Sequence, residues 1–489
     1  MEQILIKEDR FMQKYDKQFI GGEWREGSGE RVMENINPYN GEVIYSYQAA
    51  NTKDIDAAYE AAKAAQVEWS KTLPAAKQEL MEKLIAVITE MKDEFFATTC
   101  EEGGGTLPRS NYEYHTCIKI VKECMAFPLM MDGKIMPSNF PGKENYIYKK
   151  PRGVIGVIAP WNVPYVLAMR SIMPAIATGN AVVVKPSAET PASAFVLAKC
   201  FEKAGFPKGL VNVVIGASSE IGDYFVGHPI PDLISFTGST EIGRNVGKIA
   251  TEQLKEVSLE LGGNNVMILC DDADIKSAVG AAVFAAFFNS GQVCMSLNRV
   301  ICLPAVYDKF IEGFVEAVKH LPVGDPANPD SFMGPLMNNQ QAEKFNKFVA
   351  DTLAAGATAA LEGKSEGNMV YPWILSDVTN DMPTACNESF GPICNIMKAN
   401  DIEEALAIAN DTEYGLSGCV FTEDLYKGMK IASRLEVGMA HVNDQCINDE
   451  PHVMFGGEKQ SGVGRFNAQW VVDKFTTEQW ISVQTEKRF

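Results

Sequence analysis

The sequence predicts an α/β fold built around parallel sheets, and three observations support this. From Gly153 onward, short apolar runs alternate with segments of helical periodicity. The composition, 46% hydrophobic and 22% charged, is typical of a globular chain, and 489 residues suffice for two or three domains. Forty glycines against 24 prolines indicate many tight turns and close backbone approaches.

Short strands and two helices are predicted before residue 130. The runs 19–24 and 37–44 are strand-like and are broken by turn residues. Over residues 53–71 and 75–100, Ala, Leu, Ile and Met recur at helical spacing, which predicts two amphipathic helices.

The alternating region predicts a Rossmann-like domain. Its strands are expected at 154–159, 181–185, 211–215 and 233–236, and its helices through Met173, at 191–205, at 218–227 and from Glu241. The first run is almost entirely apolar, as a strand buried on both faces should be. Strands that alternate with helices of this length form a parallel sheet that is covered on both sides.

A second α/β region is predicted from about Asn264 to Met454. It opens with the strand-like run 265–269 and contains further runs at 300–302 and 419–421.

A small β element is predicted outside both α/β regions. Residues 130–150 are punctuated by proline and glycine and contain an extended patch at 144–149, which indicates a strand pair. The C-terminal run Trp480–Gln484 alternates like an exposed strand, and an unpaired strand edge can pair with another subunit. We therefore expect a first domain of residues 1–130 and 150–262, a second of 263–465, and oligomerisation strands in 131–149 and 470–489.

Charge and hydropathy exclude several partners. The formal net charge of −19, from 44 basic and 63 acidic residues, argues against a nucleic acid or an anionic membrane surface. The longest apolar run, 278–288, is far shorter than the ~20 residues that a membrane span requires.

The cysteines and the N-terminus indicate a reducing compartment. Eleven cysteines are scattered from Cys100 to Cys446 without a CxxC pair, whereas a secreted disulfide scaffold would be shorter and denser in cysteine. The segment Met1–Asp9 lacks the apolar core of a signal peptide. We expect a soluble, cytoplasmic protein.

The segment Gly291–Ser296 places Cys294 in a glycine-containing loop that follows an apolar helix. A thiol becomes an effective nucleophile when its pKa is lowered or a base lies close to it. One cysteine among eleven is more often buried and inert, so Cys294 needs support from other segments.

Two polar residues, Glu260 and Asn162, are predicted to lie in a cleft. Glu260 precedes Gly262 and Gly263, so the backbone can turn sharply there, and a carboxylate in an apolar setting can act as a general base. Asn162 follows a buried strand, and its amide can donate a hydrogen bond to a developing oxyanion. The alternatives are an exposed glutamate at a strand end and a structural asparagine in a proline-bounded loop.

The run 236–243 predicts a strand, a glycine turn and a helix. Its hydroxyl side chains suit helix capping, and its free backbone amides suit a pyrophosphate. It is not a GxGxxG fingerprint, and simple capping explains it equally well.

Taken together, six segments resemble the aldehyde dehydrogenase superfamily in order and spacing, over a region from about Phe19 to the C-terminus. They are Pro160–Asn162, Lys185–Ser187, Leu259–Gly263, Gly291–Cys294, Glu388–Pro392 and Phe455–Gly462.

The resemblance implies that the protein oxidises an aldehyde to a carboxylic acid with NAD or NADP. Cys294 would attack the aldehyde, and Asn162 with the Cys294 amide would hold the oxyanion. Hydride transfer would leave a thioester, which water activated by Glu260 would hydrolyse. The first domain would bind the cofactor, and the second would carry the nucleophile. No metal is implied.

The resemblance also implies which residues contact the cofactor. Lys185 would hold the adenosine ribose, Trp161 and Ser239 would line the pyrophosphate region, and Glu388 and Phe390 would position the nicotinamide end. Further candidates in the same segments are Ser187, Ala188 and Gly238.

One position departs from the pattern of many NAD-using members. Ala188 stands where an acidic residue would pair with the ribose hydroxyls. A small neutral residue removes repulsion toward a 2′-phosphate, with which Lys185 could pair, so NADP is an alternative to NAD. A local shift that lets Glu189 take the acidic role stays open.

The stretches 441–452 and 464–470 look like the branch that acts on benzaldehyde- and vanillin-type aldehydes. An aromatic aldehyde is therefore the expected substrate, with aliphatic aldehydes as the main alternative. We expect Val163, Leu167 and Ile447 to form apolar walls of the substrate pocket.

Two further alternatives concern the outcome of catalysis. In a CoA-acylating relative, a thiol would resolve the thioester, but the presence of Glu260 favours hydrolysis. An inactive structural or binding protein is disfavoured because Cys294, Glu260 and Asn162 are all present. Only five histidines occur and none lies beside these motifs, which disfavours a Cys/His hydrolase. The resemblance implies a homodimer or homotetramer.

Overall fold

Parallel strands form the centre of the first sheet in this computed structural model, which describes residues 15–489. The segment Met1–Asp9, which is predicted not to be a signal peptide, lies outside the described residues. The sheet consists of β1 (Gln18–Ile20), β2 (Glu23–Arg25), β7 (Val154–Ile158), β8 (Ala181–Lys185), β9 (Val211–Val213), β10 (Leu233–Thr237), β11 (Glu256–Glu260) and β23 (Gly462–Val463). In the order β2-β1-β9-β8-β7-β10-β11-β23, neighbours from β9 to β11 are parallel, and β1 and β23 pair antiparallel at the two ends.

Helices cover both faces of this sheet, which confirms the predicted Rossmann-like arrangement. Successive side chains of a strand point to opposite faces, and every residue of β8 is buried. The helices nearest the strands are α1 (Thr52–Trp69), α5 (Pro164–Ala177), α6 (Pro191–Ala204), α7 (Ser218–Gly227) and α8 (Thr240–Glu252). A further group packs on α5 and α6, namely α2 (Pro74–Glu90), α3 (Lys92–Glu101) and α4 (Leu107–Cys124).

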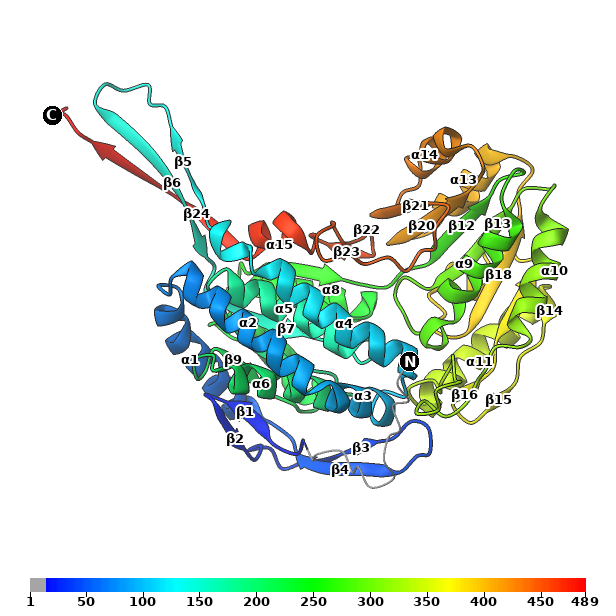
Figure 1. Cartoon of the computed structure of the whole chain (residues 1–489), viewed down its shortest axis with the longest axis horizontal. Coiled ribbons are helices and arrows are strands. Elements are labelled where there is room, and N and C mark those ends of the chain that lie inside the picture. Colours follow the sequence, from blue (N-terminus) through cyan, green and yellow to red (C-terminus); the bar gives the residue numbers. More distant parts are fainter. Residues whose placement is uncertain (1–14) are drawn as a thin grey trace.

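The second sheet is also largely parallel and forms the other lobe in Figure 1. Its order is β14 (Thr358–Leu361), β17 (Trp373–Ser376), β18 (Ile393–Lys398), β13 (Leu297–Cys302), β12 (Asn265–Leu269), β20 (Ser417–Phe421) and β21 (Met439–Val442). Only β14, at one edge, runs antiparallel to its neighbour. Helices around this sheet include α9 (Ile275–Phe287), α10 (Tyr307–Val318), α11 (Asn339–Ala354), α13 (Ile402–Asn410) and α14 (Leu425–Ala432).

A shared hydrophobic core joins the two sheets. The larger core cluster takes Val184 from β8 and Val300 from β13, together with residues of α5 and α9. Because apolar side chains of both sheets pack in one cluster, the loops that leave the two sheets face each other at defined positions.

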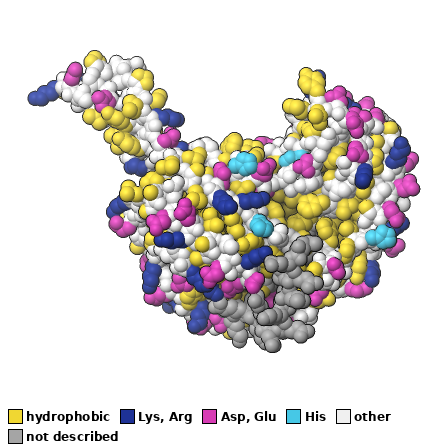
Figure 2. Space-filling model, viewed as in Figure 1, with side chains coloured by type: hydrophobic (Ala, Val, Ile, Leu, Met, Phe, Trp, Pro, Cys, Tyr) yellow, Lys and Arg dark blue, Asp and Glu magenta, His cyan; other side chains and the backbone are white. Residues whose placement is uncertain are grey.

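A three-stranded arm projects from the body of the protein (Figure 1). It consists of β5 (Gly133–Met136), β6 (Lys143–Pro151) and the C-terminal β24 (Thr476–Gln484), in the order β24-β6-β5 with antiparallel pairing. The predicted strand pair and tail strand are thus confirmed. Hydrophobic side chains lie on its surface (Figure 2), and Ile135 and Trp480 are 79% and 62% exposed.

Two sequence predictions were wrong in detail. The helix expected over 75–100 is divided at Met91, whose backbone leaves the helical region, and Asp93 and Glu94 favour a new helix N-terminus there. The strand expected over 37–44 begins only at Val43, because residues 37–42 form the turn between β3 (Val32–Ile36) and β4 (Val43–Gln48). Helix α4 was not predicted.

None of the helices in the part of the chain that the structure describes is long and apolar enough to cross a membrane. The domain limits stated above remain a prediction. One short strand bears on them, because β23 lies in the range expected for the second domain and pairs with β11 of the first sheet.

Candidate active site

Four strand ends of the first sheet bring the predicted residues to one edge. In the parallel register, Ile158 pairs with Lys185 and with Phe236, and Thr237 pairs with Glu260. The loop after β7 carries Trp161 and Asn162, and the loop after β10 carries Gly238 and Ser239. This edge is where ligands of open parallel sheets bind.

A cavity lies at this edge, between the two sheets. Its lining brings together seven predicted site residues from both halves of the chain: Trp161, Asn162, Gly238, Ser239, Cys294, Glu388 and Phe390. We call it the cofactor-side cavity. The rings of Trp161 and Phe390 meet edge to face, with their centroids 5.4 Å apart.

A second cavity meets the first at Cys294. Its walls are mostly apolar or aromatic, and it shares Asn162, Leu167 and Cys294 with the cofactor-side cavity. The three pocket walls predicted from the sequence all line it, together with residues that were not predicted: Tyr112, Val166, Arg170, Phe288, Val293, Met295 and Phe455. We call it the apolar cavity.

Cys294 therefore lies at the junction of two cavities of different character. It is half-buried, whereas nine of the other cysteines are buried and Cys386 is exposed. Burial, and then the carboxylate of Glu388, raise the pKa of the Cys294 thiol to about 12. The protein alone does not lower the thiol pKa, so the thiolate needs a nearby base or positive charge.

A strained loop presents this thiol. Asn289, Ser290 and Gly291 have φ angles of 52°, 57° and 73°, in the left-handed region that L-residues rarely adopt. The position of Gly291 excludes a side chain, because an added Cβ would lie 2.2 Å from the Gly391 carbonyl oxygen.

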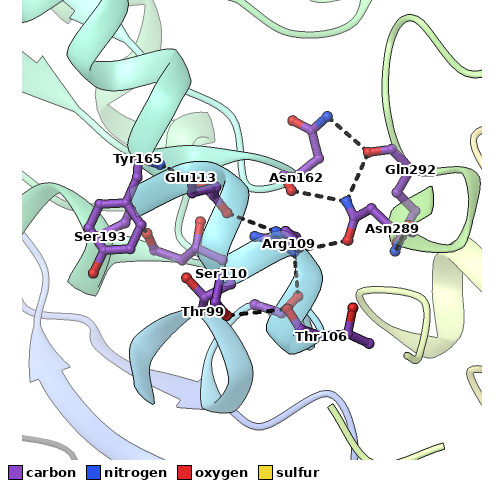
Figure 3. A network of polar contacts seen from close by, with 12 residues as sticks. Thr99, Thr106, Arg109, Ser110, Glu113, Asn162, Tyr165, Ser193, Asn289 and Gln292 are labelled. Atoms are coloured by element: carbon purple, nitrogen blue, oxygen red, sulfur yellow. Dashed lines mark hydrogen bonds and ion pairs between the residues drawn. The ribbon is translucent and has the colours of Figure 1, made fainter. Parts of the chain in front are cut away.

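Hydrogen bonds from Asn289 hold the loop against Asn162 (Figure 3). The Asn289 Nδ2 group donates to the carbonyl oxygens of Asn162 at 3.1 Å and Gln292 at 3.2 Å. Asn162 Nδ2 donates to the same Gln292 carbonyl oxygen at 3.0 Å. One of the two Asn162 amide hydrogens is used in this way, and the other is left for a ligand.

A buried ion pair on α4, between Arg109 and Glu113, contacts Asn289 and the backbone that follows the Asn162 loop (Figure 3). Arg109 Nε donates to Glu113 at 2.8 Å, and Arg109 Nη1 donates to Asn289 Oδ1 at 3.2 Å. The second Glu113 oxygen accepts the backbone N–H of Tyr165 at 2.9 Å, just after the Asn162 loop. Neither Arg109 nor Glu113 was predicted, because an i,i+4 charge pair usually indicates an exposed helix face.

Glu260 is buried beside this site but lines neither cavity. Among the described residues, no group donates a hydrogen bond to either of its carboxylate oxygens. Burial raises the pKa of Glu260 to about 8, although Arg170 and Arg465 oppose the shift. A Cβ at Gly456 would lie 3.0 Å from Glu260 Oε1, so the glycine leaves room for the carboxylate.

Glu388 lies on the cofactor side of Cys294. Its carboxylate accepts the backbone N–H of Gly263 at 3.2 Å, and burial raises its pKa to about 7. The backbone of the neighbouring Phe390 is left-handed, with a φ of 47°, which turns the chain at the cavity wall.

Lys185, Ser187 and Ala188 do not line the cofactor-side cavity, although they leave the same sheet edge. Lys185 is buried, which lowers its pKa to about 8, and its Nζ donates to Ser218 Oγ at 2.7 Å. Glu189 accepts a hydrogen bond from Asn338 Nδ2 at 3.3 Å.

A buried charge pair, one member of which lines the apolar cavity, was not predicted from the sequence. Arg170 forms an ion pair with Asp449, and the two side chains are 4% and 2% exposed. A signal was present, since Arg170 is the only charged residue of the otherwise apolar α5. Among the described residues, no cluster of three or more His, Cys, Asp or Glu could hold a metal ion.

We expect Asn289→Asp to lower the free energy of unfolding by about 2 kcal/mol or more, because buried carbonyl groups lose their donor and face a carboxylate oxygen instead. Chemical denaturation followed by tryptophan fluorescence measures the change. Asn40→Asp, at an exposed turn, is the matched control and should change stability little. Equal stability of the two variants would show that Asn289 does not hold the junction.

The chain is similar to known proteins over nearly its whole length. The Aldehyde dehydrogenase family matches residues 24–481. The chain is 47% identical to benzaldehyde dehydrogenase YfmT of Bacillus subtilis, over 97% of this chain and 98% of that protein. It is 46% identical to a vanillin dehydrogenase of Corynebacterium glutamicum, over 96% and 97%. The crystal structure of an NAD-dependent benzaldehyde dehydrogenase from Corynebacterium glutamicum superposes with a TM-score of 0.89 at 42% identity, covering 96% of this chain and 99% of that one.

A match over nearly the whole length, together with a thiol between two cavities at the ends of parallel strands, establishes that the chain belongs to the aldehyde dehydrogenase family.

Proposed function

We propose that this protein oxidises an aromatic aldehyde to its carboxylic acid with a nicotinamide cofactor, through a thioester on Cys294. One observation carries the proposal: the apolar cavity and the cofactor-side cavity meet at this thiol. A substrate in the first and a cofactor in the second would therefore reach the same sulfur atom from two sides.

The walls of the apolar cavity support an aromatic substrate. Tyr112, Phe288 and Phe455 contribute rings, and Val163 and Ile447 add aliphatic surface. Flat aromatic ligands pack well against such side chains, edge to face or stacked. The names of the similar proteins, benzaldehyde and vanillin dehydrogenases, agree with this class.

The cofactor-side cavity suits the nicotinamide and pyrophosphate parts of a dinucleotide. Ser239 caps the N-terminus of α8, where free amides favour a pyrophosphate, and Trp161 and Phe390 offer rings. We assign the nicotinamide end to Glu388 and Phe390, the pyrophosphate to Trp161, Gly238 and Ser239, and the adenosine ribose to Lys185, Ser187 and Ala188. When bound, the oxidised nicotinamide ring supplies the hydride acceptor and a positive charge that favours the thiolate.

NAD fits this site, and Ala188 leaves room for NADP. No carboxylate stands at position 188 to repel a 2′-phosphate, and Glu189 is engaged by Asn338. The Lys185 ammonium lies at the end of β8, three residues before Ala188 in the sequence. We infer that both cofactors are used.

The residues around Cys294 have separate roles in the reaction. The Cys294 thiol first loses its proton to solvent, and the thiolate then attacks the carbonyl carbon. The free Asn162 amide hydrogen and the Cys294 backbone N–H hold the resulting oxyanion. Loss of hydride from that carbon leaves the thioester. Glu260 then takes a proton from water, whose oxygen attacks the thioester carbon, and the carbon–sulfur bond breaks to release the acid. The unpartnered, buried carboxylate of Glu260 supports this role.

We further propose that the arm of β5, β6 and β24 joins subunits in a homodimer or homotetramer. Strand β24 pairs with β6 along one edge only, and its side chains from Thr477 onward are exposed. Trp480, Ile481 and Val483 add apolar surface that a second subunit would cover.

Cys294→Ala should abolish aldehyde oxidation, because no other group at the junction can form the carbon–sulfur bond. Binding of NAD, measured by fluorescence titration, should survive. Cys386→Ala, which removes the exposed cysteine, is the matched control and should stay active. Full activity of the Cys294 variant would exclude the nucleophile assignment.

Steady-state turnover should rise with pH through about 8, because the raised pKa of Glu260 leaves the carboxyl group protonated, and inactive as a base, below that value.

Glu260→Gln should keep a rapid hydride burst in stopped-flow measurements but slow steady turnover about a hundredfold or more, as loss of a general base does. Equal loss of burst and turnover would remove Glu260 from the hydrolytic step.

A substrate panel tests the proposed function directly. We expect kcat/KM for benzaldehyde and vanillin to exceed that for acetaldehyde and hexanal at least about tenfold. Acetaldehyde is too small to fill the cavity, and a rigid aromatic ring packs on the aromatic walls with less loss of conformational freedom than the flexible chain of hexanal. Both NAD and NADP should be reduced, and added CoA should give no acyl-CoA. Preference for the aliphatic aldehydes would refute the proposed substrate class, and acyl-CoA formation would refute hydrolysis.

A further inference from the structure

One charged side chain stands in the wall of the apolar cavity. Arg170 belongs to α5, whose residues are all buried, and its side chain is 4% exposed. It lines the cavity that contains Cys294. A buried guanidinium group is costly to desolvate, so its presence among apolar walls calls for a role or a partner.

The positive charge of Arg170 is neutralised by Asp449. The Nη2 group of Arg170 donates to Asp449 Oδ2, and Asp449 Oδ1 accepts a hydrogen bond from Asn467 Nδ2 at 3.1 Å. The face of the guanidinium group stacks on the Phe455 ring, 3.9 Å from its centroid. The pair therefore adds no net charge to the cavity wall.

Two donors of Arg170 are left over. Its Nε and Nη1 groups are buried and have no hydrogen-bond partner among the described residues. Buried donors are almost always paired in folded proteins, so these two are free to serve a bound ligand. Nearby Glu260 is a second acidic group of the site, since the charges of both Arg170 and Asp449 act on it.

We propose that the Arg170–Asp449 pair selects the ring substituents of the aldehyde, an inference that rests on the proposed function. The free Arg170 donors bind a neutral oxygen substituent on the ring, such as a hydroxyl or an ether. Asp449 neutralises the positive charge of Arg170, so that an aldehyde bearing a carboxylate binds poorly.

The physical reason lies in the charge balance of a buried site. An unmasked arginine would bind a carboxylate through paired, charge-assisted hydrogen bonds. With Asp449 in place, the same carboxylate would bring a second anion to one buried cation, and the cost of removing that carboxylate from water would not be offset. A neutral ether or hydroxyl oxygen accepts from Nε or Nη1 without this penalty.

The experiment compares matched aldehydes on the full-length protein. In the wild type, kcat/KM should be about tenfold higher for 3- or 4-methoxybenzaldehyde than for the ethyl analogue of similar size, as one hydrogen bond provides. It should be at least about tenfold lower for 4-carboxybenzaldehyde than for benzaldehyde, because the carboxylate must be desolvated beside Asp449.

Asp449→Asn should raise the ratio of 4-carboxybenzaldehyde to benzaldehyde at least about tenfold, because it unmasks the cation. The double variant Arg170→Met with Asp449→Asn avoids a lone buried anion and should abolish the methoxy preference. Glu403→Gln, which breaks the exposed pair of Glu403 with Arg434, is the matched control and should change neither ratio.

The outcomes separate this inference from the proposed function. Unchanged ratios in a folded Asp449→Asn protein would overturn the inference alone. If that variant does not fold, equal wild-type kcat/KM for methoxy and ethyl analogues, or for carboxylated and plain benzaldehyde, overturns it equally. If the wild type oxidises no aromatic aldehyde, the proposed function fails, and this inference fails with it.

Discussion

The hydrogen bonds between Asn289, Asn162 and Gln292 are the contact on which the rest of the site depends. They join the loop after β7 of the first sheet to the loop before β13 of the second, at distances of 3.0 to 3.2 Å. The left-handed backbone conformation of Asn289 is unfavourable in free energy by itself. It persists because these hydrogen bonds, and the one that Arg109 donates to the Asn289 side chain, hold the residue in place. This contact fixes the Asn162 amide relative to the loop that carries the Cys294 thiol, and Asn265 anchors the same loop by donating to the Cys294 carbonyl oxygen at 2.8 Å.

Burial then sets the proton affinities of the groups around the thiol. The pKa values of Cys294, Glu260 and Glu388 are all raised, with desolvation as the largest cause in each case. Neutral forms of these groups are favoured until a positive charge or a proton acceptor arrives. Raised pKa values from burial are typical of functional sites, where a bound ligand can shift the balance between the protonation states.

The two cavities differ in the polarity of the residues that line them. On the cofactor side, polar strand-end loops and a helix N-terminus suit an anionic dinucleotide, and the first sheet supplies most of them. On the other side, α5 and the segment around Ile447 form an apolar wall, interrupted by Arg170 and its masking partner. We propose that the chemistry takes place where these two surfaces meet.

The sequence by itself determined the α/β class, most strands of the first sheet, three of the seven strands of the second sheet, the arm and the residues that meet at Cys294, because these rest on local periodicity and on contiguous motifs. It also identified Val163, Leu167 and Ile447 as walls of one cavity. Only the tertiary structure brought Arg109 to Asn289 and Arg170 to Asp449, partners that lie 180 and 279 residues apart. It alone decided that Cys294 has a raised pKa, since desolvation depends on how the whole chain packs around a residue and not on its neighbours in sequence.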